Sequence, residues 1–113
     1  MTTQTAGPPE AAPRDKVMEL DAAIAAHVHD GDTICPEGFG HLIPFAAAHE
    51  IIRQGRRGLT LVRMTPDLIA DQLIAADCVD RLVASFFASG SAGSLHEVRR
   101  RIQHHDPRPL EVE

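Results

Sequence analysis

The stretch from Asp30 to Phe45 most limits the folds open to this chain. It reads as a turn, a short strand, a glycine loop and the start of a helix in immediate succession. Asp30-Gly31 is typical of a turn, and residues 33–35 are a small β-favouring run. Pro44 suits a first helical turn, because the N–H that proline lacks would have no partner there. The sequence therefore predicts a strand that enters a helix through a glycine loop.

We define the glycine loop as residues 36–41; within it Gly38 and Gly40 flank Phe39. A strand, loop and helix in this order place backbone N–H groups above the carboxyl end of a strand. Open α/β sheets bind anionic or carbonyl-bearing ligands at that position. We expect the functional site here, and the alternative is a purely structural turn, since many α/β folds turn with Gly-x-Gly.

Strand-like and helix-like segments alternate along the rest of the chain. Apolar residues recur at helical spacing in four segments, and four short segments favour strand. Helices are expected at 17–28, 43–54, 65–76 and 94–103, and strands at 33–35, 59–64, 81–87 and from 110. The alternation predicts an α/β fold with a mainly parallel open sheet and flanking helices. The largely apolar run at 59–64 is typical of a strand covered on both faces. Ser94 and Glu97 have capping-box spacing.

The length of 113 residues suits one domain. Residues 1–14, rich in Thr, Ala and Pro, are expected to be a disordered leader, because they cannot bury enough apolar surface to offset the entropy of ordering. Residues 15–113 would form the domain. The final residues 110–113 begin a fourth strand, so we expect an incomplete fold: a fragment, a truncated product or a chain completed by a partner.

The formal charge of −5 argues against nucleic-acid binding, which depends on clustered Lys and Arg. Arginines do cluster at 53–57 and at 99–101. Each cluster lies near the end of a predicted helix, where cations complement the helix dipole, so we interpret both as solvated helix ends. No segment has the roughly twenty apolar residues of a membrane span, and the N-terminus lacks a secretory signal. We expect a cytoplasmic protein with no membrane contact.

Two cysteines, Cys35 and Cys78, are too few for a disulfide framework or a zinc site. We expect Cys35, on the first strand, to be a small buried apolar residue. His27 and His29 point in different directions on a helix, so no metal site is predicted.

Several motifs together resemble the α subunits of family I coenzyme A transferases, in particular the glutaconate CoA-transferase-like group. The first is Asp30-Gly31-x-x-Ile34-Cys35-x-x-Gly38-Phe39-Gly40-x-x-x-Pro44. It is followed, in family-like order, by segments 49–55, 59–67, 71–74 and 93–96. The likeness covers most of the chain beyond residues 1–14, and the ordered set is much more specific than the glycine loop alone.

The resemblance implies a two-part enzyme that moves coenzyme A from an acyl-CoA to a carboxylic acid. In the family, a glutamate carried by the β half attacks the thioester, forms an acyl anhydride and then a glutamyl-CoA thioester, and passes the CoA on. The partner would therefore be a β subunit in a hetero-oligomer, the CoA thioester would be a substrate, and no cofactor would be permanently bound. No catalytic residue is assigned to this chain, which we expect to be inactive alone.

The residues expected to line the substrate pocket are those of the glycine loop: Glu37, Gly38, Phe39, Gly40 and His41. Glu37 is interpreted as a carboxylate that shapes the pocket, because the family's nucleophile lies in the other subunit. The alternatives are a turn with a core Phe39, and a His41 that is merely solvated.

Two departures from the family pattern leave other functions open. Glu37-Gly38-Phe39 replaces the usual Gly-Gly-Phe, and residues 86–93 replace a Trp-Gly-Gly-Asn-Pro-type loop. Loss of the asparagine in that loop would remove a polar group facing the substrate. The alternatives are therefore a non-catalytic remnant or partner-binding α/β fragment, and an acyl-CoA hydrolase subunit.

Overall fold

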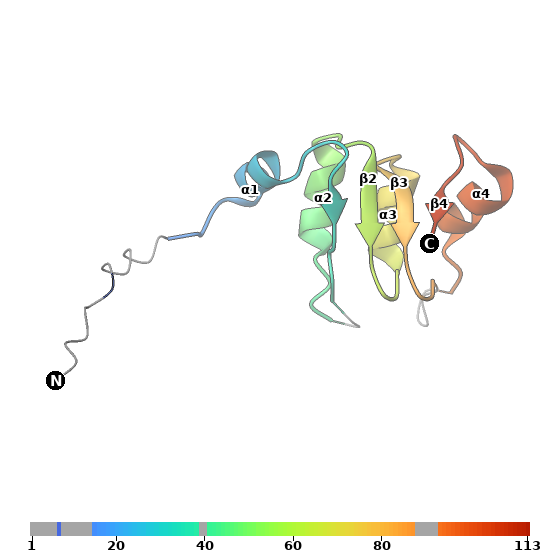
Figure 1. Cartoon of the computed structure of the whole chain (residues 1–113), viewed down its shortest axis with the longest axis horizontal. Coiled ribbons are helices and arrows are strands. Elements are labelled where there is room, and N and C mark those ends of the chain that lie inside the picture. The colour runs from blue at the N-terminus through green and yellow to red at the C-terminus, as the bar shows by residue number, and fades with distance from the viewer. Residues whose placement is uncertain (1–6, 8–14, 39–40, 88–92) are drawn as a thin grey trace.

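The computed structural model describes Gly7 and residues 15–38, 41–87 and 93–113. The leader predicted for residues 1–14 lies outside these ranges apart from Gly7. Within them, helices and strands alternate along the chain (Figure 1). The helices are α1 (Leu20–His27), α2 (Phe45–Arg53), α3 (Leu68–Ala75) and α4 (His96–His104). The strands are β1 (Thr33–Ile34), β2 (Leu59–Val62), β3 (Val79–Val83) and β4 (Glu111–Val112).

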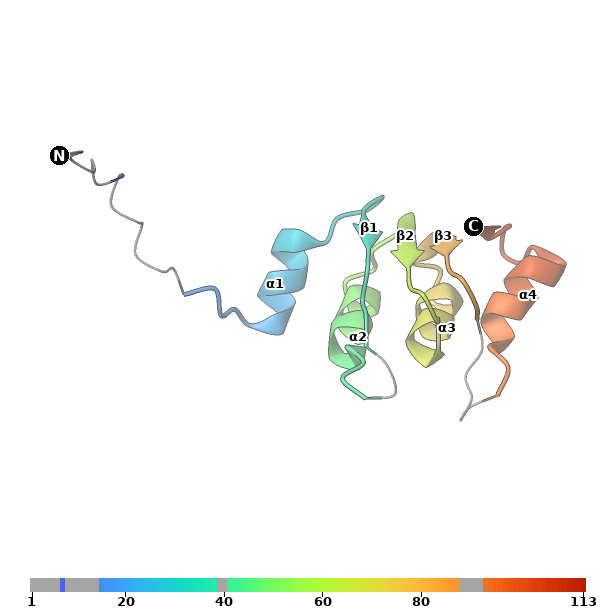
Figure 2. The ribbon, with the colours of Figure 1, turned by 60° about the horizontal axis from the view of Figure 1, so that its bottom comes forward.

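The strands form one parallel sheet in the order β1-β2-β3-β4. Because each strand lies beside the next one in sequence, every crossover runs in the same direction. Crossovers between parallel strands are right-handed, so the connecting helices α2, α3 and α4 must lie on one face. Figure 2 shows them side by side on that face. The predicted α/β fold with a parallel sheet and flanking helices is confirmed.

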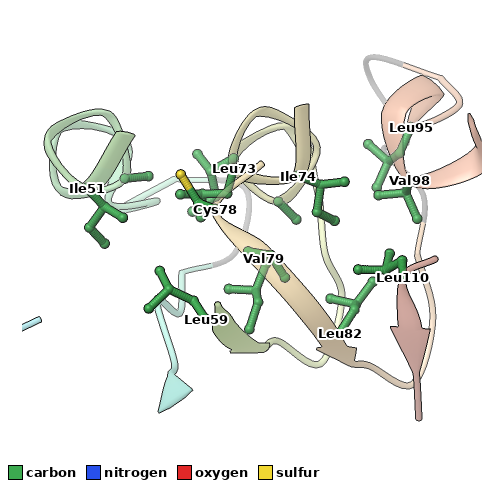
Figure 3. Packing of buried hydrophobic residues seen from close by; sticks show 14 of the residues in the cluster. Ile51, Leu59, Leu73, Ile74, Cys78, Val79, Leu82, Leu95, Val98 and Leu110 are labelled. Carbon is green, nitrogen blue, oxygen red and sulfur yellow. The ribbon is translucent and has the colours of Figure 1, made fainter. Parts of the chain in front are cut away.

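The core lies between the sheet and this helix layer (Figure 3). Its side chains are almost all aliphatic, as expected of a chain without Trp or Tyr. In β2, Leu59 and Leu61 are buried while Thr60 and Val62 are half-buried. This alternation arises because no described segment covers the second face of the sheet, so the expectation that β2 is covered on both faces is wrong for the described chain.

The third strand lies earlier than predicted, at Val79–Val83 instead of 81–87. The apolar pair Phe86 and Phe87 suggested a longer strand, but these side chains are exposed. Strand pairing ends instead at Ser85, whose backbone N–H and side-chain hydroxyl both donate to the carbonyl oxygen of Met64. The chain therefore leaves the sheet before the two phenylalanines.

Helix α4 is capped by another helix and not by its own sequence. The backbone N–H groups of Glu97 and Val98 each donate to Asp71 Oδ1 of α3 at 2.9 Å. Ser94 instead accepts a hydrogen bond from Arg99. The predicted capping box of Ser94 and Glu97 is wrong, because a carboxylate of the neighbouring helix already occupies both amide donors.

The predicted fourth extended segment is confirmed as β4, which pairs with β3. The segment before β4 is attached by Arg101 of α4, whose guanidinium donates to the carbonyl oxygens of Val79, Arg108 and Pro109. Arg101 also pairs with Asp77 at 3.5 Å, and its side chain is 1% exposed. The interpretation of cluster 99–101 as a solvated helix end is therefore wrong for Arg101.

Candidate functional site

The described residues of the glycine loop, 36–38 and 41, follow β1 and lie at the carboxyl end of the parallel sheet, as the sequence predicted. The loops that follow β2 and β3 emerge at the same edge, because parallel strands all end on one side. In Figure 1 the arrowheads of β1, β2 and β3 point toward this common edge. Residues of three different connections therefore meet there.

Arg63, the first residue after β2, donates hydrogen bonds to the backbone of the glycine loop. Its side chain is only 1% exposed. Nη1 donates to the carbonyl oxygen of Pro36, and Nη2 donates to that of Gly38 at 3.0 Å. Nε has no acceptor among the described residues. The two terminal nitrogens thus bind the loop on both sides of Glu37.

The charge of Arg63 is balanced by Asp67, whose Oδ2 lies 3.0 Å from Nη2 of Arg63. Asp67 is also the N-cap of α3, and its Oδ1 accepts the backbone N–H of Ile69 at 3.4 Å. A carboxylate at this position both neutralises a buried cation and satisfies a helix donor that has no partner within the helix. Arg63 and Asp67 therefore join the glycine loop to the start of α3.

Glu37 adds a hydrogen bond from the glycine loop to the connection that follows β2. Its Oε1 accepts the backbone N–H of Met64 at 3.1 Å. One carboxylate oxygen is thereby engaged with the neighbouring loop, while the residue as a whole stays exposed. This contact holds the Glu37 side chain against the residue that follows Arg63.

Gly38 is required by a close backbone approach. A Cβ at this residue would lie 2.4 Å from the carbonyl oxygen of Leu42, far inside van der Waals contact. Leu42 itself has a φ of +61°, a conformation that costs a non-glycine residue about 1 kcal/mol or more. Gly38 therefore packs tightly against the residues that precede α2.

The structure brings together three of the five predicted pocket residues at one edge: Glu37 and Gly38 within the loop, and an exposed His41 at its end. Phe39 and Gly40 lie outside the described residues. Arg63 and Asp67 were not predicted from the sequence. The signal available was a charged residue directly after an apolar strand, followed four residues later by an acid in a Thr-Pro-Asp helix start.

Exposed apolar side chains surround this edge. Leu42 follows the glycine loop, Met64 follows β2, and Phe86 and Phe87 follow β3; their exposed fractions are 85%, 67%, 61% and 41%. A cavity of about 220 Å³ lies beside α4, lined by Phe87, Ser94, Leu95, Arg99, Ile102 and Gln103. The described residues of the predicted pocket do not line this cavity, so they form an open surface and not its wall.

The two cysteines differ from expectation. Cys35, at the carboxyl end of β1, is exposed and not buried as predicted, because strand pairing of β1 ends at Ile34. Cys78 is fully buried before β3, and burial raises the pKa of its thiol. Across the described ranges, no three His, Cys, Asp or Glu side chains gather in an arrangement able to hold a metal ion. None of the helices described is long and apolar enough to span a bilayer.

Comparison with known proteins agrees with the resemblance found in the sequence. The sequence model of the family described as Coenzyme A transferase matches residues 17–103. The chain is 48% identical over 98 residues to the A-type subunit of the 3-oxoadipate CoA-transferase of Pseudomonas knackmussii, covering 87% of this chain and 35% of that protein. It is 34% identical over 88 residues to an uncharacterized protein of Archaeoglobus fulgidus, covering 77% of this chain and 20% of that protein. The chain thus spans about a third or less of these relatives.

Among solved structures, the chain is similar to a cysteine-to-serine variant of the decarboxylase AibA/AibB. The TM-score is 0.70 at 27% identity, and the match covers 85% of this chain and 37% of that one. The fold inferred from the sequence is therefore shared with a solved protein over most of the described residues.

Proposed function

This chain belongs to the coenzyme A transferase family, and we propose that it is the N-terminal part of an α subunit that moves coenzyme A from an acyl-CoA to a carboxylic acid. The observation that carries the proposal is the placement of the family's glycine loop. It lies at the carboxyl end of a parallel sheet and is fixed there by Arg63. The proposal includes a cytoplasmic location and a hetero-oligomeric assembly.

In this proposal the glycine loop lines part of the pocket for the acyl-CoA and the acceptor carboxylate. Glu37 shapes the pocket, Gly38 permits the close turn, and His41 lies exposed beside it. Phe39 and Gly40 are included on the resemblance alone. A β subunit supplies the glutamate that attacks the thioester, so this chain contributes binding and orientation and carries no covalent step. Orientation of bound reactants is a large part of catalysis in its own right.

The first substrate to test is set by the 48% identical relative, whose name specifies 3-oxoadipate. The chain is mixed with the β subunit of a coenzyme A transferase, and the mixture is separated by size-exclusion chromatography with light scattering. Any complex is assayed with acetyl-CoA or succinyl-CoA and isotopically labelled 3-oxoadipate. We expect a stoichiometric complex that forms the labelled thioester. The chain without the β subunit is the control and should form none.

Other outcomes of this assay correspond to other functions. Release of free CoA without labelled thioester would indicate a hydrolase, and release of CO₂ would indicate a decarboxylase, the activity named for the structural neighbour. A complex without any turnover, or no complex, would indicate a non-catalytic remnant or partner-binding fragment. Each of these results contradicts the transferase proposal.

A further inference from the structure

Arg63 is a buried side chain that joins two connections at the carboxyl edge, the one between β1 and α2 and its own between β2 and α3. It binds the glycine loop through two carbonyl oxygens, and it pairs with the N-cap of α3. The residue that follows it, Met64, donates its N–H to Glu37 and accepts two hydrogen bonds from Ser85 after β3. The ends of β1, β2 and β3 are thus connected through residues 63 and 64.

This arrangement makes the position of the glycine loop depend on a guanidinium. The carbonyl oxygens of Pro36 and Gly38 flank Glu37, so fixing both fixes the peptide units between them. A lysine at residue 63 would carry the same charge on one nitrogen, whereas arginine reaches separate acceptors with separate nitrogens in a planar fork. Because Arg63 is 1% exposed, its guanidinium meets these carbonyl oxygens away from bulk solvent.

We propose that Arg63 is the positioning residue of the coenzyme A transfer site, a role that builds on the proposed function. It does not touch the substrate; it holds residues 36–38 and the Asp67-capped start of α3 in one fixed arrangement. A loop displaced by about 1 Å lowers the rate of a positioned reaction by up to about a hundredfold. Loss of Arg63 should therefore lower kcat more than it raises KM for the acyl-CoA.

The test compares the two arginines whose side chains are buried in the described structure. Arg63→Lys and Arg101→Met are prepared in the complex of this chain with the β subunit. Arg101 lies at the amino end of the sheet, away from the glycine loop, so its loss lowers stability without displacing residues 36–38. Activity is measured at a temperature at which circular dichroism shows each complex to be folded.

We expect Arg63→Lys to lower kcat about tenfold or more, with KM for the acyl-CoA within about threefold of wild type. Arg101→Met should keep both parameters within about twofold. Asp67→Asn, which keeps a capping oxygen for α3 but removes the charge partner, should give a smaller loss of kcat in the same direction. The proposal is overturned if Arg63→Lys is as active as wild type, or if Arg101→Met loses as much kcat.

Amide hydrogen exchange gives a second readout that does not depend on turnover. In the full chain, exchange at Glu37 and Met64, whose N–H groups donate to Cys35 and Glu37, should become at least about tenfold faster in Arg63→Lys. It should stay unchanged in Arg101→Met under conditions where both variants are folded. If the wild-type complex transfers no CoA, the proposed function fails while this measurement still decides whether Arg63 fixes the loop. Unchanged exchange in Arg63→Lys would refute the positioning role whatever the reaction proves to be.

Discussion

Arg63 and Arg101 are both 1% exposed and both donate to backbone carbonyl oxygens of a loop, but they lie at opposite ends of the sheet. Arg101 attaches the segment before β4 to the amino end of β3. Arg63 attaches the glycine loop at the carboxyl end, where α/β folds place ligands. The same chemistry therefore serves assembly of the sheet at one end and geometry of the candidate site at the other.

The difference extends to the surroundings of the two arginines. Arg101 pairs with Asp77, and Arg108 pairs with both Asp77 and Asp80. The amino end of the sheet is therefore stabilised by several ion pairs. At the carboxyl end, Arg63 pairs with a single acid among the described residues, Asp67, and exposed apolar side chains lie nearby. One end is held by a network of charges within this chain, whereas the other presents apolar surface.

The largest effect on stability should come from Arg101→Met. The substitution leaves the carbonyl oxygens of Val79, Arg108 and Pro109 without their donor, and we expect the free energy of unfolding to fall by about 3 kcal/mol. Urea denaturation followed by circular dichroism measures the change. Arg99→Met, at an exposed position of the same helix, should stay within about 0.5 kcal/mol of wild type. A loss no greater than that of Arg99→Met would show that Arg101 does not hold the amino end.

Gly38→Ala should have the second largest effect, because the new Cβ would overlap the carbonyl oxygen of Leu42. Relief of this overlap requires the loop to move, and we expect a loss of about 2 kcal/mol together with lower CoA transfer. Gly55→Ala is the matched control: its φ is +68° but no atom lies within 4 Å of the added Cβ. That strain alone should cost about 1 kcal/mol, and the variant should keep its activity. Equal activity losses in the two variants would count against a specific need for the loop geometry.

Asp71→Ala should lower stability by about 1 kcal/mol, the usual contribution of a helix cap. It removes the acceptor of two backbone donors at the start of α4, which also lies at the carboxyl edge. Thermal unfolding of Asp71→Ala and Ser94→Ala provides the comparison, and Ser94→Ala should change little. A larger loss in Ser94→Ala would restore the capping box that the sequence predicted.

The smallest effect is expected for the ion pair of Glu50 with Arg53, whose guanidinium is exposed, unlike those of Arg63 and Arg101. Hydrogen bonds from Arg53 and Gln54 lower the pKa of Glu50 from 4.5 to about 2. A carboxylate with a depressed pKa in the folded state contributes stability above its unfolded pKa, and this contribution is lost as the pH falls from about 4.5 through 2. The melting temperature of wild type should therefore exceed that of Glu50→Gln slightly at pH 6, and the gap should close by pH 2. A gap that is the same at both pH values would contradict the shift.

The sequence determined the class of fold, because the alternation of apolar runs and breakers is local information. It also located the glycine loop, the order of the elements and a fourth strand from residue 110, which the structure shows at Glu111–Val112. Crossovers between parallel strands are right-handed, so helices that connect neighbouring strands in sequential order must all lie on the same face of the sheet. Once the strand order is known, the helix layer on one face follows from the sequence.

Tertiary structure alone decided which polar side chains hold the edges of the sheet. Asp71 replaces the local cap of α4, Arg101 turns inward from a cluster interpreted as solvated, and Arg63 reaches back 25 residues to Gly38. These partners are far apart in sequence, and no periodicity or spacing marks them. Their roles follow from burial. Once packing excludes water from a backbone carbonyl or amide, a nearby side chain must form the hydrogen bond that water would have formed.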